Sequence, residues 1–423
     1  MAQAQGSKGL LSIQYEDSYG ATPATPDMTK VYFESEGFKA SKNLITSQSI
    51  SGTRHSTTPI AGNIDTQGSI AAELQVGIGT LLNAALGSIK TTLTSGSETT
   101  TGSATISACS STLGAVAASQ TMILTLVPTS HLFVIGDTLL LGAGATINAV
   151  DVSTYRFRVV AQSSGSVTVR VPLGLAGELV VTPGNVKKVA AGGGGTAYTH
   201  EFKSGGILPS VLVEKAFTDL ATPQYLTYSG CKVSKLSLNV APEGFQKISF
   251  DFVGKQETIS TSPFDSTITD LLKKSFSGGE ISGILENGGA TTTVTKIDLS
   301  LDNSLDTGIY CLAGAGKRSD IPIGTTKVTG TLEVLFDSIT LYQKAIDSTE
   351  STLKITYTKG TGAGTLGNEL LEIFLPELIF KQDTPVIGGD KGVLVTLPFE
   401  TFYDNNADAT QLKITLKCPQ LSL

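Results

Sequence analysis

Residues 234–253 have the sequence SKLSLNVAPEGFQKISFDFV, and they decide the fold class. Apolar residues occupy every second position on both sides of residues 241–245. They are Leu236, Leu238 and Val240 before this connection and Ile248, Phe250 and Phe252 after it. Because successive side chains of a strand point to opposite faces, the pattern predicts an antiparallel hairpin with one buried face.

Strand-like segments continue to the C-terminus, and the 46 glycines with many Ser and Thr residues favour turns over long helices. The further predicted strands are 293–301, 326–336, 353–358, 370–380, 393–398 and 411–417. Pro376 places its strand at an edge or at a bulge. The sequence therefore predicts an all-β protein with one or two short helices and two packed antiparallel sheets.

One short amphipathic helix is predicted between residues 76 and 88, ending at Gly87. Its apolar residues at helical spacing are Ile78, Leu81, Leu82, Ala85 and Leu86. A short alternating strand over residues 68–74 precedes it.

The N-terminal part of the chain has few apolar residues. Residues 1–27 are polar with Pro23 and Pro26 and are predicted to be an arm, without the apolar run of a signal peptide. Residues 35–66 are rich in Gly, Ser, Thr and Lys, which predicts a long loop or an extended, weakly anchored hairpin. With no apolar stretch of membrane-spanning length either, we expect a soluble product without a membrane partner.

Two flexible tracts suggest an inserted domain. Residues 92–106 form a Ser/Thr/Gly-rich linker, and residues 192–195 are four consecutive glycines. Four predicted strands lie between them, at 122–127, 138–141, 155–160 and 166–171. The predicted domains are an arm at 1–27, a main domain from 28–100 and 191–423, and a small inserted β domain at 107–190.

Composition and motifs argue against an enzyme. The net charge of -7 and the absence of Trp disfavour a surface that grips nucleic acid. Residues 362–367 match GxGxxG but precede a predicted strand with Pro376 instead of a helix, so a hairpin turn is predicted. Residues 314–317 resemble the end of a phosphate-binding loop, but Arg318 stands where Ser or Thr is needed, so a turn is predicted there too.

No group of residues has the spacing of a metal or catalytic site, so we expect no cofactor. The histidines His55, His131 and His200 are scattered, and we expect surface or strand positions for them. Asp298, Asp302 and Asp306 do not have the spacing of a calcium loop and are interpreted as solvated loop charges. The cysteines are far apart and are predicted to be buried free thiols; they are Cys109, Cys231, Cys311 and Cys418.

The chain contains a weak internal echo. The residues Arg54, Pro59, Ile60, Gly62 and Gly68-Ser69-Ile70 recur in order as Arg318, Pro322, Ile323, Gly324 and Gly330-Thr331-Leu332. The spacings differ by two residues, so a duplication and a chance similarity both remain open.

Several motifs, taken in order, resemble the tail tube proteins of long-tailed bacteriophages. The opening Tyr15–Pro23 resembles the E-x-x-x-G-T/A-x-P start of that family. The later matching segments are Gly62, 68–74, 86–87, 200–202, 208–210, 228–233, 251–255 and 328–332. The resemblance covers most of residues 10–100 and 196–423.

The resemblance implies a structural subunit that assembles in stacked, hexameric rings around an acidic lumen through which DNA is ejected. It also implies as partners the chain itself, a tape measure protein, and tail terminator and distal tail proteins, with DNA only passing through. The subunit would belong to the virion and assemble in the cytoplasm of the bacterial host. Because residues 107–190 would obstruct a lumen, we expect them on the outer wall.

Two other functions remain open on the sequence: the tube of a contractile injection or tailocin-like device, and a β-sandwich adhesin. For a tube, the long polar segment 35–66 is the candidate ring-to-ring contact. Its candidate contact residues are Ile45, Ile50, Arg54 and Ile60.

Overall fold

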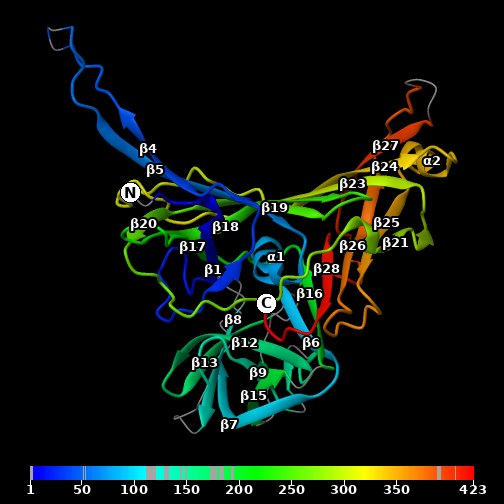
Figure 1. Ribbon diagram of the computed structural model, residues 1–423, viewed down its shortest axis with the longest axis horizontal. Coiled ribbons are helices and arrows are strands. Elements are labelled where there is room, and N and C mark those ends of the chain that lie inside the picture. The colour runs from blue at the N-terminus through cyan, green and yellow to red at the C-terminus, as the bar shows by residue number, and fades with distance from the viewer. Residues whose placement is uncertain are drawn as a thin grey trace.

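The computed structural model confirms the all-β fold class with two short α-helices (Figure 1). It describes residues 3–50, 52, 54–110, 121–127, 133–142, 145–147, 150–171, 179–180, 185–191, 195–387, 392–404 and 406–423.

One antiparallel sheet crosses the molecule from one projection to another, and we call it the spanning sheet (Figure 1). In spatial order its strands are β4 (Lys39–Ile45), β5 (Ile60–Glu73), β19 (Lys247–Gly254), β18 (Gln224–Val240), β23 (Val294–Asp302), β24 (Lys327–Leu335) and β27 (Leu394–Thr401), with β3 (Ser35–Glu36) also beside β5. The predicted hairpin is its centre, where Leu238 of β18 lies opposite Ile248 of β19. Both side chains are buried, as the alternation predicted.

Further strands pack against the buried face of the spanning sheet. On the side of β4 they are β2 (Thr29–Val31), β1 (Leu10–Tyr15), β17 (Val211–Phe217), the first half of β18 and β20 (Gln256–Ser260). On the side of β27 they are β22 (Gly289–Ala290), β21 (Ile281–Glu286), β25 (Glu350–Thr358), β26 (Leu370–Phe380), β28 (Lys413–Cys418), β16 (Ala197–Lys203) and β6 (Ile89–Ser95). One continuous hydrophobic core fills the space between the layers.

The prediction of an N-terminal arm over residues 1–27 is wrong for residues 10–15. These residues form β1, which lies between β2 and β17, and Leu11 and Ile13 are buried in the core. The polar composition of the surrounding residues concealed a strand whose longer pairing, with β17, joins residues about 200 positions apart in the sequence, as Ile13 opposite Val213 shows.

The predicted helix is confirmed as η2 (Val76–Ile78) followed by α1 (Gly79–Leu86). Gly87 ends it in the left-handed conformation, with φ of 84°. All residues of α1 are buried, including Asn83, whose Nδ2 donates to the Tyr15 hydroxyl at 2.9 Å. The other helices are η1 (Gly6–Lys8), η3 (Gly278–Glu280) and α2 (Thr340–Asp347).

Strands inserted between β6 and β16 form a barrel with its own hydrophobic core. Its ladder closes in the order β12 (Tyr155–Ser163), β13 (Ser166–Arg170), β8 (Thr121–Val127), β7 (Glu98–Ser110), β15 (Asn185–Ala191), β9 (Thr138–Leu140) and back to β12. A small sheet consists of β11 (Val150–Asp151), β10 (Thr146–Ile147) and β14 (Leu179–Val180). In Figure 1 the barrel lies on the side opposite the spanning sheet.

The prediction of a flexible linker at residues 92–106 is wrong. These residues belong to β6 and β7, which carry the chain into the barrel. The many Thr residues that suggested a linker are β-branched and fit a strand equally well. Of the glycines 192–195, only Gly195 lies in the described residues.

Candidate assembly surfaces

The outward face of the spanning sheet is polar and consists mainly of small side chains. Every second residue of its strands points away from the core, so that β19 presents Lys247, Ser249 and Asp251, and β23 presents Lys296, Asp298, Ser300 and Asp302. This places Asp298 and Asp302 in a strand and corrects their interpretation as loop charges; Asp306 lies in the following loop.

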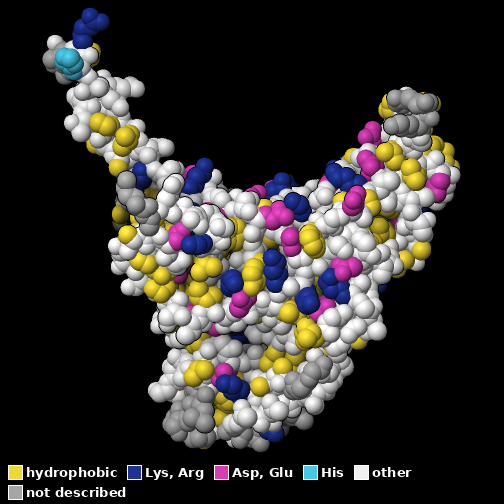
Figure 2. All heavy atoms as spheres, viewed as in Figure 1, with side chains coloured by type: hydrophobic (Ala, Val, Ile, Leu, Met, Phe, Trp, Pro, Cys, Tyr) yellow, Lys and Arg dark blue, Asp and Glu magenta, His cyan; other side chains and the backbone are white. Residues whose placement is uncertain are grey.

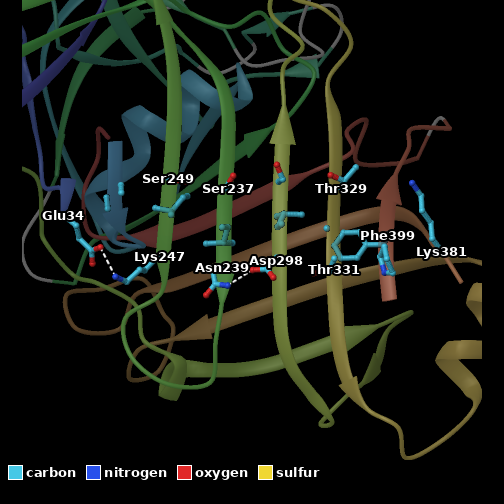
Figure 3. Close-up of a pocket in the computed structure, with 18 residues that line it drawn as sticks. Glu34, Ser237, Asn239, Lys247, Ser249, Asp298, Thr329, Thr331, Lys381 and Phe399 are labelled. Atoms are coloured by element: carbon cyan, nitrogen blue, oxygen red, sulfur yellow. Dashed lines mark hydrogen bonds and ion pairs between the residues drawn. The ribbon is translucent and has the colours of Figure 1, made fainter. Parts of the chain in front are cut away.

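A shallow groove of about 490 Å³ runs across this face, and Figure 3 shows its lining. At one end the Lys247 ammonium lies 2.9 Å from a carboxylate oxygen of Glu34. In the middle Asn239 donates to Asp298 at 2.5 Å. Burial alone would raise the pKa of Asp298, but hydrogen bonds from Lys296 and Asn239 lower it below its ordinary value.

Charges of both signs alternate on the spanning sheet, with a small excess of carboxylates. The outward-facing carboxylates of β5, β19, β23, β24 and β27 are Asp65, Glu73, Asp251, Asp298, Asp302, Glu333 and Glu400. The outward-facing lysines of β18, β19, β23 and β24 are Lys235, Lys247, Lys296 and Lys327. Lys235 lies opposite Asp251 on one side and Asp302 on the other, so both cross-strand neighbours of this lysine have the opposite charge. Figure 2 shows these mixed charges along the hollowed surface between the two projections.

The segment 35–66 forms a hairpin, so the second of its two predicted forms is confirmed. Strands β4 and β5 pair from Lys39 opposite Gln67 to Ile45 opposite Ile60, and the hairpin projects beyond the sheet (Figure 1). The four predicted contact residues are brought to this projection: Ile45, Ile50, Arg54 and Ile60 are all exposed, as is the neighbouring Leu44. Ile45 and Ile60 lie opposite each other in the ladder, so these two exposed side chains are neighbours on the hairpin.

A second exposed apolar surface, not predicted from the sequence, lies at the opposite end of the spanning sheet. We call it the α2 surface; its residues are Leu335, Phe336, Ile339, Ile346, Val386, Ile387 and Leu394. Helix α2 buries only Ala345, whereas Ile387 is 82% exposed. Only the fold shows that the outer side of α2 is uncovered, because its exposure depends on which elements lie beside it.

The motif Glu16-x-x-x-Gly20 has a structural explanation. The Glu16 carboxylate accepts hydrogen bonds from the Gly20 amide at 2.8 Å and from the Gly230 amide at 2.7 Å. Burial raises the pKa of Glu16, although these hydrogen bonds act in the opposite direction. Gly230 has φ of 67° and marks the point where β18 passes from pairing with β20 to pairing with β19 of the spanning sheet.

The turn predictions for both glycine motifs are confirmed. Residues 362–367 connect β25 to β26, and residues 314–317 form a turn in which the Lys317 amide donates to the Gly314 carbonyl oxygen. Within the described residues, no cluster of three or more His, Cys, Asp or Glu side chains is placed to hold a metal ion. None of the described helices is long and apolar enough to cross a membrane.

The histidine and cysteine predictions are confirmed in part. His55 is exposed, His200 is buried in strand β16, and His131 lies outside the described residues. Cys231 and Cys418 are buried free thiols, but Cys311 is an exposed free thiol because its turn lies on the surface. The side chain of Cys109 lies outside the described part of the chain.

Comparison with known proteins places the chain in a family. No curated protein matches it. A family model described as phage tail tube protein matches residues 6–401, which includes the spanning sheet, the barrel and both projections. The chain therefore belongs to the phage tail tube protein family and is a structural subunit of a bacteriophage tail.

Proposed function

We propose that the chain assembles into stacked rings of hexameric geometry around a bore through which DNA is ejected. The observation that carries this proposal is the combination of the family match with one uninterrupted sheet whose outward face is polar and hollowed. We assign this face to the bore. The barrel, on the opposite side, then lies on the outer wall, where it leaves the bore open.

The chemistry of the face suits the passage of DNA. A surface that retains DNA needs clustered Lys or Arg residues that displace counterions from phosphates. Here the lysines lie among carboxylates, and the remaining outward residues of the groove are mainly Ser, Thr and Asn. Such a wall binds phosphates weakly, as a conduit requires.

The partners in this proposal are other copies of the chain, a tape measure protein inside the bore during assembly, and tail terminator and distal tail proteins at the two ends. Assembly takes place in the cytoplasm of the bacterial host, and the subunit has a structural, non-enzymatic role. The β4–β5 hairpin, with Ile45 and Ile60 exposed, is a contact between copies.

Negative-stain imaging of the purified protein tests the proposal. We expect rings or tubes with an open bore, formed equally well with and without a chelator. Separate particles at all concentrations would contradict it.

The DNA-conduit assignment has its own test. Replacing Asp251 and Asp302 by Lys should make assembled tubes retain short duplex DNA in a salt-dependent way. The control replaces two exposed carboxylates off this face, Asp151 and Glu243, by Lys and has the same net charge. Equal DNA binding by the two variants would count against the assignment.

A further inference from the structure

The chain contains the same strand arrangement twice. The first unit consists of β1–β5, α1 and β17–β20, and the second of β21–β28 and α2. Seven strand pairs of the first unit have a counterpart in the second. They are β1–β2 with β21–β22, β1–β17 with β21–β25, β4–β5 with β23–β24, β5–β19 with β24–β27, β17–β18 with β25–β26, β18–β19 with β26–β27, and β18–β20 with β26–β28. The barrel is an insertion between α1 and β17 of the first unit.

The registers of the two units also agree. Gly68 of β5 lies opposite Phe252 of β19, and Gly330 of β24 lies opposite Phe399 of β27. These glycines belong to the segments 68–70 and 330–332 of the internal echo, which is therefore a structural repeat. Chance similarity of two loops would not reproduce both the pairing scheme and the register.

The two helices occupy equivalent places but differ in exposure. Helix α1 follows β5 and α2 follows β24. All of α1 is buried, whereas α2 buries only Ala345. The first unit is therefore covered over α1, whereas the equivalent helix α2 of the second unit is exposed.

Part of that cover comes from the second unit itself. Strand β23 pairs with the second half of β18, with Asp302 opposite Lys235. The residue after β23, Asn303, donates from Nδ2 to the carbonyl oxygen of Ala85, close to the end of α1. Further along the same connection, Arg318 donates to the carbonyl oxygen of Gly254 at 3.0 Å.

Strand β23 and the second half of β18 pair with each other, but each of their counterparts has a free edge. The counterpart of β23 is β4, whose outer edge is paired with no strand among the described residues. The counterpart of the second half of β18 is the segment 381–387, because Phe380 lies opposite Phe399 as Val233 lies opposite Phe252. This segment is not in a strand and adjoins the α2 surface, where the Gln382 amide donates to the Tyr342 hydroxyl at 3.2 Å.

We propose that β4 of one copy pairs with residues 381–387 of a second copy and covers its α2 surface, as β23 and Asn303 cover β18 and α1 within one chain. The contact is head to tail, because its two sides lie at opposite ends of the spanning sheet (Figure 1). Head-to-tail contacts close into a ring when the rotation is right. The β4–β5 hairpin is then a contact within the ring and not the ring-to-ring contact expected from the sequence.

This inference rests on the proposed function for the hexameric geometry of the ring, which requires six of these units. Since each chain supplies two units, the ring closes with three chains. The unit-to-unit contact then alternates between one made inside a chain and one made between chains.

Cysteine cross-linking tests the register. Ser41 lies opposite Asp65 as Asp302 lies opposite Lys327, and these partners occupy equivalent positions three residues before Gly68 and Gly330. Ser41 is therefore the counterpart of Asp302. Lys235 lies opposite Asp251 because the ladder shifts by one residue at Ser234, and the Lys381 amide donates to the carbonyl oxygen of Pro398, the residue equivalent to Asp251; Lys381 is therefore the counterpart of Lys235. Residues directly opposite on antiparallel strands have Cβ atoms about 5 Å apart. Both positions are exposed, so substitution does not disturb the core.

The experiment uses the full chain with Cys109→Ser and Cys311→Ser, assembled, treated with a short bismaleimide and separated under denaturing conditions. With Ser41→Cys and Lys381→Cys together, we expect a ladder that ends at three chains. The matched control combines Ser41→Cys with Lys235→Cys and should give no ladder, because β23 already occupies that edge. A second pair, Asp302→Cys with Lys235→Cys, should cross-link within one chain.

Each outcome separates the alternatives. A ladder ending at six chains, a ladder without an upper limit, or no ladder from protein that forms rings overturns the inference and leaves the proposed function standing. A ladder without an upper limit would support the ring-to-ring contact of the β4–β5 hairpin that the sequence predicted. Absence of rings and tubes in images of the same sample would overturn the proposed function together with the inference.

Discussion

Asn303 donates from Nδ2 to the carbonyl oxygens of Ala85, at 2.9 Å, and of Val233, at 3.0 Å, and so connects the second unit to the helix and the central strand of the first. Asn303 is 1% exposed, so water cannot replace these bonds. Asn303→Ala should lower the free energy of unfolding by about 2 to 4 kcal/mol, because two buried acceptors lose their donor. Urea unfolding measures the change. Asn43→Ala, at an exposed position, is the control and should be nearly neutral.

Gly230 combines a positive φ with a crowded position. A Cβ at Gly230 would lie 2.7 Å from Cβ of Lys255 and would add to the strain of φ at 67°. Gly244 has φ of 78° but no atom within 4 Å of its Cβ position. Gly230→Ala should therefore be less stable than Gly244→Ala by about 1 to 3 kcal/mol, the cost of the clash after the backbone strain cancels. Equal melting temperatures of the two variants would show that the β18 bend tolerates a side chain.

His200 should make stability fall in mild acid. Burial lowers its pKa to about 4, against the ordinary 6.5, and its ring nitrogens lie near the Thr91 hydroxyl and the Gln420 carbonyl oxygen. Between pH 6.5 and 4 the unfolded chain binds a proton at this residue and the folded chain does not, so stability is present above pH 6.5 and is lost as pH falls. The loss contributed by His200 is about 3 kcal/mol. Stability measured against pH should show a shallower slope for His200→Gln, whereas His55→Gln, at an exposed position, should keep the original slope.

The barrel should be removable. Ser95 of β6 lies opposite Ala197 of β16, so a short Gly/Ser turn can join these strands in place of residues 96–196. The barrel has a separate core, and we expect the remainder to fold with some loss of stability because the ion pair between Arg158 and Asp27 disappears. Images of the assembled variant should show a thinner outer wall and an unchanged bore. A changed bore would place the barrel in the wall of the tube.

The thiols should differ in reactivity. Burial raises the pKa of Cys418 to about 12 and raises that of Cys231 as well, whereas Cys311 is exposed. In a Cys109→Ser background at pH 8, a maleimide should modify Cys311 within minutes and the other two only after unfolding, because the reactive species is the accessible thiolate. Mass spectrometry of peptides gives the order. Rapid modification of Cys231 would show that the core around Glu16 opens.

The sequence by itself determined the fold class, the central hairpin, helix α1 and the family. Alternation over residues 234–253 and helical spacing over 76–88 are local patterns, and local patterns can be recognised in the sequence alone. The motif at Glu16 and Gly20 was also visible, although its reason was not: the second glycine that completes it, Gly230, is 214 residues away from Glu16.

Only the tertiary structure decided what depends on long-range pairing. Strand β1 was hidden in a polar segment because its stability comes from β17, and residues 92–106 became strands because the barrel supplies their partners. The exposure of α2 and the free edge of β4 depend on which elements lie beside them in the fold. The local sequence of α2 or β4 does not specify those neighbours. The strand pairing showed that the weak echo of glycines belongs to two units with the same pairing scheme and register, since register is a property of strands placed side by side and not of either strand alone.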